Sequence, residues 1–152
     1  MSCSMDPKTD PLAKPIRLDF TSVMQVVVTP ENKDRFVTTS KEAAHACKVA
    51  EDSKAWGGEF DQFLMFVHEW CAQYAHEALK CFVGVSDEGL TVFVVTKGAE
   101  YNFGFDDAIT ALNLEIADKF PSISANAIQV PNVAEDNLAS FVSLPHAIQV
   151  HG

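Results

Sequence analysis

The fold is decided by residues 82–96, whose sequence is FVGVSDEGLTVFVVT. Two runs rich in β-branched and aromatic residues flank the polar segment Ser86–Gly89, a pattern typical of strand, turn and strand. The sequence therefore predicts that Phe82–Val85 and Leu90–Thr96 pair as an antiparallel hairpin.

The second of these strands is apolar on both sides. Val92 and Val94 point one way, whereas Phe93 and Val95 point the other, because side chains alternate along a strand. Both faces of the sheet therefore need cover. We expect one layer of helices to be insufficient, which is one reason to expect a second copy of the chain.

The hairpin is predicted to continue into a third strand. Lys97–Gly98 is a candidate two-residue turn, and the next segment is EYNFGF, residues 100–105. In a strand, Tyr101, Phe103 and Phe105 would share one face. The expected result is a three-stranded antiparallel meander with an aromatic face.

Two amphipathic helices are predicted to pack on this sheet. The Trp-Gly-Gly segment at 56–58 is expected to break the chain. After it, between Glu59 and Lys80, apolar residues recur at the three- and four-residue spacing of a helix: Phe60, Phe63, Leu64, Val67, Trp70, Cys71, Tyr74 and Ala78. A second helix is expected to begin near Asp106 and to end before Pro121, since the residue before proline disfavours helix.

Shorter elements complete the prediction. We expect one bent strand or two short strands over 16–28, a short helix opening at Thr29–Glu31, a helix from Thr39 to about Asp52, a strand over 125–130, a short helix over 132–142 and a strand over 147–150. Residues 1–15 contain three prolines and predict a disordered tail before a single domain over 16–152. The fold class is therefore α+β, with the meander inside a mixed sheet of about five strands.

The net charge of −10 is unevenly distributed. Residues 1–56 hold eight basic and eight acidic residues, whereas residues 57–152 hold three basic and 13 acidic ones. A phosphate backbone would be repelled by the second region, so we expect no nucleic-acid partner. A protein partner guided by charge should be basic and should approach residues 57–152.

The four cysteines are expected to be reduced thiols in the cytoplasm. No CxxC pair and no secretory signal are present, and no apolar run approaches the ~20 residues that a membrane span requires. Disulfides persist mainly in oxidising compartments.

We also expect no metal and no cofactor. His68, Cys71, His76 and Cys81 lie within fourteen residues, but the helical rotation spreads them around the axis, so they cannot share one ion. His68 and Cys71 could form half a site only if His45, His146 or His151 completed it.

Catalytic signals are missing from the sequence. The chain has no GxxxxGK[ST], GxGxxG, GxSxG or HExxH motif. Its acidic cluster, formed by Glu100, Asp106, Asp107, Glu115 and Asp118, is expected to be a solvated face, although it could hold Ca²⁺ or Mg²⁺ weakly. We therefore lean against an enzyme.

Two further residues are candidates for contact with a partner. Leu114 falls on the polar face of the second helix, between Asp107 and Asp118. Trp56 lies beside two glycines, and Trp is enriched at interfaces, although it would equally cap the core of the long helix.

The leading hypothesis is a non-catalytic cytoplasmic interaction or adaptor domain that binds another protein and forms a homodimer, through Trp56, Leu114 and the aromatic residues of 101–105. The alternative is a small-molecule-binding or enzymatic domain with an aromatic pocket around Tyr101, Phe103 and Phe105.

Overall fold

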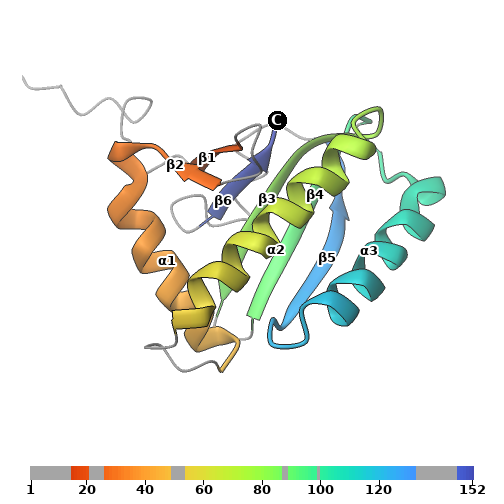
Figure 1. Ribbon diagram of the computed structural model, residues 1–152. Helices are drawn as coiled ribbons and strands as arrows, with labels where there is room; N and C mark the ends of the chain where they lie inside the picture. The colour runs from red at the N-terminus through yellow and green to blue at the C-terminus, as the bar shows by residue number, and fades with distance from the viewer. Residues whose placement is uncertain (1–14, 21–25, 49–53, 87–88, 99, 133–146) are drawn as a thin grey trace, which may run out of the picture.

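The computed structural model describes residues 15–20, 26–48, 54–86, 89–98, 100–132 and 147–152. Within these ranges three helices, six strands and two short 3₁₀ turns follow one another. In chain order, and as labelled in Figure 1 where there is room, they are β1 (Ile16–Phe20), β2 (Val26–Val28), η3 (Pro30–Asn32), α1 (Lys33–Ala46), α2 (Lys54–Gln73), β3 (Ala78–Ser86), β4 (Gly89–Thr96), η4 (Phe103–Phe105), α3 (Asp106–Lys119), β5 (Ala125–Val130) and β6 (Ala147–His151).

The strands form one mixed sheet in the order β2-β1-β6-β3-β4-β5. β3 and β4 are antiparallel, with Phe82 opposite Phe93, and β6 is antiparallel to β3 on its other side. β5 runs parallel to β4, and β1 runs parallel to β6. The α+β class, the mixed sheet and the central hairpin are confirmed.

The third strand of the predicted meander is not present. β4 has β3 along one edge and β5 along the other, from Leu90 beside Ala125 to Val95 beside Val130. No edge of β4 is left for residues 100–105, which instead form an extended approach and the 3₁₀ turn η4. The antiparallel meander therefore reduces to a two-stranded hairpin with a parallel neighbour.

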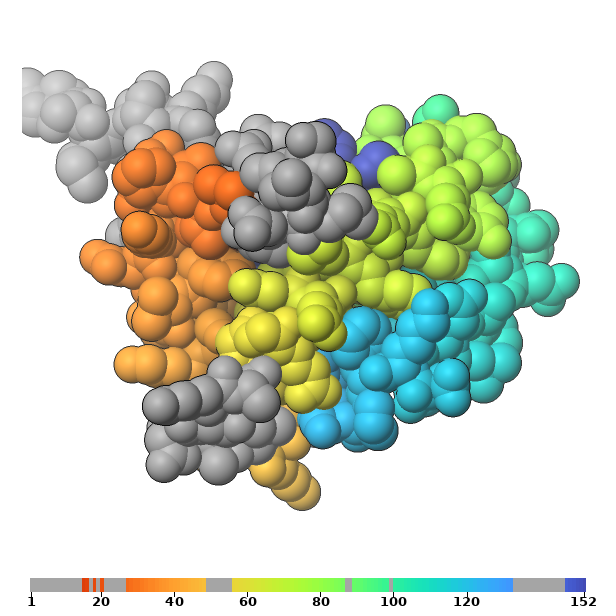
Figure 2. Space-filling model, in the orientation of Figure 1, coloured from red at the N-terminus to blue at the C-terminus, as the bar shows by residue number. Residues whose placement is uncertain are grey.

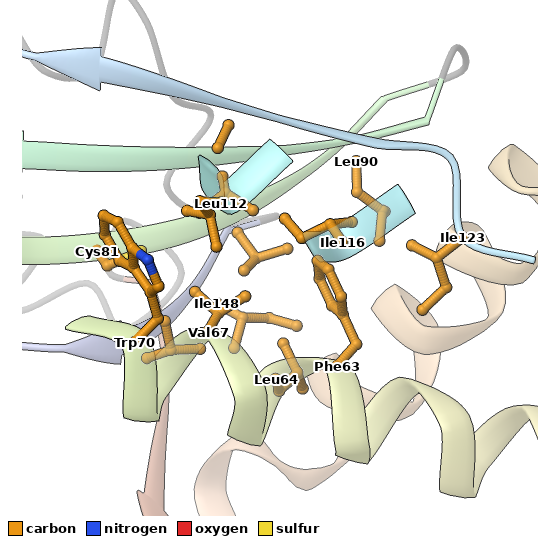
Figure 3. Packing of buried hydrophobic residues seen from close by; sticks show 14 of the residues in the cluster. Phe63, Leu64, Val67, Trp70, Cys81, Leu90, Leu112, Ile116, Ile123 and Ile148 are labelled. Carbon is orange, nitrogen blue, oxygen red and sulfur yellow. The ribbon is translucent and has the colours of Figure 1, made fainter. Parts of the chain in front are cut away.

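The helices pack on one face of the sheet, where the main core lies (Figure 1). Val92 and Val94 of β4 face α2, whose Phe63, Leu64 and Val67 are completely buried. Figure 3 shows these side chains pointing toward the sheet, with Leu112 and Ile116 of α3 among them. Burial of a large apolar side chain contributes about 1.5–3 kcal/mol, so this layer accounts for much of the stability.

The long helix begins earlier than its sequence predicts. Trp56, Gly57 and Gly58 were expected to break the chain, yet they lie inside α2. The ring of Trp56 is buried against Phe60 at 5.4 Å between centroids, and its indole N–H donates to the carbonyl of Ser40 at 3.0 Å. These contacts offset the helix cost of two glycines, about 1 kcal/mol each. α2 also ends at Gln73 rather than Lys80, because β3 starts at Ala78.

The helix predicted to begin at Thr39 begins earlier in the structure, at Lys33. η3 begins at Pro30, as the Thr29–Glu31 pattern predicts, and α1 continues from it without a break at Lys33. Thr39 lies buried in the middle of α1, so its apparent capping signal is internal. The two predicted elements are thus one helical segment.

The second face of the sheet carries a smaller apolar cluster. Phe82, Val95, Val130 and Ala147 form it, with Phe93 packed against them. Every described member lies on a strand, and the four are 0–3% exposed within a single copy of the chain. The expectation that both strand faces are covered is confirmed, and the burial of these four residues does not require a second copy.

Two sequence predictions fall outside the described residues, wholly or largely: the tail over 1–15 and the helix over 132–142. The helix predicted to reach about Asp52 instead ends at Ala46, with Cys47 as its C-cap. Among the described helices, none combines the length and the apolarity that a membrane span requires.

The outer edge of β5 is occupied by a side chain. Asn113 of α3 donates from Nδ2 to the carbonyl of Ala127 at 3.1 Å, and its Oδ1 accepts from the N–H of Ala127 at 2.6 Å. The amide thereby takes the place that a neighbouring strand would take. Blocking an edge in this way is a means by which proteins avoid strand pairing between molecules.

We expect Asn113→Ala to lower the free energy of unfolding by about 1–2 kcal/mol, because two hydrogen bonds are lost. Self-association should rise, since the edge is uncovered. Urea denaturation and sedimentation velocity measure the two effects, with Asn126→Ala, an exposed site on the same strand, as the control. Identical behaviour of the two variants would contradict the assigned role of Asn113.

Candidate interaction surface

A buried glutamine of β5 fixes the loop that leads into α3. Gln129 accepts the backbone N–H of Asn102 at 2.7 Å through Oε1, and its Nε2 donates to the carbonyl of Asn102 at 3.0 Å. The same Nε2 donates to Oδ1 of Asp106 at 3.1 Å. Asn102 also donates from Nδ2 to Glu77 at 2.8 Å. Asn102 is therefore held from two separate parts of the fold, by Gln129 of β5 and by Glu77 ahead of β3.

The residues on either side of Asn102 carry exposed aromatic rings. Tyr101 is 42% exposed and Phe103 is 79% exposed. Their rings meet edge to face at 4.9 Å between centroids, and the hydroxyl of Tyr101 donates to Asp106. This hydrogen bond to the carboxylate is the main cause that raises the pKa of Tyr101, so its hydroxyl stays protonated. The pair is an exposed apolar surface on a fixed backbone.

Phe105 does not belong to this surface. It is buried between Trp70 and Tyr74, at 5.8 Å and 5.7 Å between ring centroids. Residues two apart share a face in a strand but not in a 3₁₀ turn, where each residue rotates by about 120°. The prediction that Tyr101, Phe103 and Phe105 share one face is therefore wrong, and Phe105 instead anchors the turn to the core.

Leu114 lies further along the chain, on α3. It is 68% exposed, and by helical rotation Asp107 and Asp118 flank it. Eight residues separate Leu114 from Asp106, a rise of about 12 Å. Figure 2 shows α3 at the flank of the molecule, where a partner could approach it. We use the name α3 surface for Tyr101, Phe103 and Leu114 with the carboxylates of Asp106, Asp107 and Asp118.

The other residues of the acidic cluster add charge around this surface. Glu100 and Glu115 are exposed, and Glu115 is 3.8 Å from the ammonium of Lys119. That ammonium also lies over the ring of Phe66, at 4.8 Å from its centroid. Exposed carboxylates of this kind contribute little to stability, and their effect is an attraction for basic groups.

The structure places Trp56 in the core, where its indole packs on Phe60. Trp56 therefore offers no exposed surface to a partner. Of its two predicted roles, the structure favours the one in which it caps the core of the long helix.

His68 and Cys71 of α2 lie in different environments. Cys71 and Cys81 are buried and their thiols are in contact; burial, then the hydrogen bond to Cys71, raises the pKa of Cys81 well above its ordinary value. His68 points elsewhere, toward Phe20 and the backbone of Val150. Within the described part of the chain, no three His, Cys, Asp or Glu side chains gather as metal ligands.

Two hollows lie away from the α3 surface. One of about 490 Å³ lies between α1 and the end of β3, lined by Thr38, Lys41, Glu42, His45, Ala46, Val85 and Ser86. The other, of about 260 Å³, is lined by Leu18, Phe20, His68, Gln149, Val150, His151 and Gly152. Neither includes the aromatic residues of 101–105.

Comparison with protein-family models, with curated proteins and with solved structures finds no match for this chain.

The sequence predicts the exposed apolar residues of the α3 surface but not the residues that hold its backbone in place. Tyr101, Phe103 and Leu114 are candidates on sequence grounds, whereas Gln129 and Asn102 are not. Their contact joins residues 27 apart, and no spacing rule links an amide in one strand to a loop backbone. Only the burial of a polar residue in a predicted strand could have drawn attention to Gln129.

Proposed function

We propose that this chain is a non-catalytic protein-interaction domain whose α3 surface binds a basic partner. The observation that carries the proposal is the exposed pair Tyr101 and Phe103 on a backbone held by Gln129. Aromatic side chains dominate binding energy at interfaces. A surface that is already ordered loses less entropy on binding, which favours affinity.

The charge of the α3 surface supports a basic partner. Asp106 and Asp107 come three and four residues after Phe103, and Asp118 lies one turn beyond Leu114. Complementary charge mainly accelerates association. A partner segment with one large apolar residue for the aromatic pair and another for Leu114 would fit.

Cytoplasmic location is part of this proposal. Cys71 and Cys81 are free although their thiols are in contact, which fits a reducing compartment.

Phe103→Ala is expected to weaken partner binding by about 30-fold or more, which corresponds to a hot-spot loss of about 2 kcal/mol. The partner would first be isolated from the native cell with the unaltered chain and then titrated by calorimetry. Val37→Ala is the matched control, because Val37 is an exposed apolar residue on α1. Equal affinity of the two variants would refute the role of the α3 surface.

Sedimentation of the isolated chain tests whether the partner is a second copy. A dimer that Phe103→Ala dissociates would make self-association the use of this surface. A monomer at micromolar concentration, together with capture of a basic protein, would assign it to another chain.

A further inference from the structure

We propose that His68 and His151 form an open two-histidine site for a divalent transition-metal ion such as Zn²⁺. The two residues lie on α2 and at the end of β6, and both line the hollow of about 260 Å³. This site is distinct from the α3 surface and does not depend on the proposed function.

His68 is held in the tautomer that a metal ligand needs. Its Nδ1 is 2.7 Å from the carbonyl oxygen of Val150. A carbonyl can only accept, so Nδ1 carries the proton and donates it. In the neutral ring the lone pair is therefore on Nε2. A hydrogen bond from the second ring nitrogen to a backbone carbonyl is the usual support of a histidine ligand.

The ring of His68 is also fixed in orientation. Phe20 stacks on it with 3.9 Å between ring centroids and 7° between ring planes. Together with the bond to Val150, this contact restricts rotation about the side-chain torsions, so little entropy remains to be lost when a metal binds.

His151 is supported in a similar way. The backbone of Ala78 acts on its ring as a hydrogen-bond partner. Burial, the largest effect, lowers the pKa of His151, and the nearby His68 lowers it further.

The spacing of the rings is close to that of a bound pair. Their centroids are 6.5 Å apart with 59° between the planes, whereas tetrahedral Zn²⁺ with nitrogen at about 2.0–2.1 Å would place them roughly 5 Å apart. Binding thus requires the two rings to approach each other by about 1.5 Å. Imidazole nitrogen suits Zn²⁺, Cu²⁺ and Ni²⁺, and water would fill the remaining positions of an open site.

The neighbouring thiols do not take part. Cys71 is three residues from His68, but its sulfur is buried in the core beside Cys81. The site is therefore a nitrogen site that exchanges metal with solvent, which differs from a closed structural zinc site with four protein ligands.

The test is a Zn²⁺ titration of the full chain, followed by NMR of the individual imidazole rings. The rings of His68 and His151 should shift together, with one shared dependence on Zn²⁺ concentration. His68→Asn is a sharp variant, because the asparagine amide can still donate to Val150 from the position of Nδ1 while Nε2 is removed. It should weaken binding at His151 about tenfold or more.

A control variant separates this site from nonspecific metal binding by surface histidines. His76→Gln removes an exposed histidine elsewhere and should leave the affinity unchanged. The proposal is overturned if His68 and His151 respond at different Zn²⁺ concentrations, or if His68→Asn leaves binding at His151 intact while circular dichroism shows the native fold. Because each ring is observed separately, metal bound elsewhere on the chain does not count as support.

Discussion

Phe63→Ala is expected to lower the free energy of unfolding by about 3–5 kcal/mol, the cost of emptying the space of a buried phenylalanine. Phe63 is 0% exposed, and its ring meets Phe120 edge to face at 5.5 Å between centroids. It extends from α2 toward α3 and β4 (Figure 3). Its removal therefore leaves a cavity where the helices and the sheet meet. The total free energy of unfolding of a domain is about 5–15 kcal/mol, so this loss would be a large share of it.

The matched control is Phe103→Ala, which removes the same atoms from a side chain that is 79% exposed. We expect a change within about 0.5 kcal/mol, as for most surface substitutions. Urea denaturation of the two variants measures the difference. An equal loss of stability in both variants would mean that Phe63 is not buried or that Phe103 is not exposed as described. If Phe103 were buried, the α3 surface would not exist as described.

The contrast between these phenylalanines also shows how far sequence reasoning reaches. Phe63 was predicted to be buried because apolar residues recur around it at helical spacing, a local signal. The strand over 125–130 and the helix that begins near Asp106 were also predicted closely, and Pro121 marks the end of that helix. Such patterns succeed where a segment's own periodicity matches the face that it buries.

The predictions failed where distant segments compete. Residues 100–105 alternate like a strand, but β5 already occupies the edge of β4 that they would need. Gly57 and Gly58 predict a break, but the burial of Trp56 against α1 favours continued helix. In each case a contact with another element decided the outcome, and no local pattern contains that contact.

The candidate sites also divide into features that a local pattern predicts and features that depend on distant contacts. Leu114 could be predicted to be exposed from helical rotation alone. The hydrogen bond between His68 and Val150 joins residues 82 apart, so the sequence could offer His151 only as one of three possible partners of His68, beside His45 and His146. Contacts of this length are created by the order of strands in the sheet, which brings β6 beside β3 and beneath α2.

Gly89→Ala is expected to destabilise the fold by at least about 2 kcal/mol, because two costs combine at this position. The φ of Gly89 is +140°, in a region that residues with a Cβ rarely adopt, at a cost of about 1–3 kcal/mol. A Cβ there would lie 2.5 Å from the carbonyl oxygen of Ser124. That oxygen accepts the N–H of Leu90 at 2.8 Å, so moving it away weakens the pairing of β4 with β5.

The informative comparison is Gly58→Ala, where we expect the opposite sign. Gly58 lies in α2, and a Cβ would meet nothing within 4 Å. Alanine at an exposed helical position is favoured over glycine by about 0.5–1 kcal/mol. The midpoints of urea denaturation should therefore move apart, down for Gly89→Ala and up for Gly58→Ala. A gain at Gly89 would show that the chain turns differently there, and a loss at Gly58 would show that α2 begins after the glycines, as the sequence alone predicts.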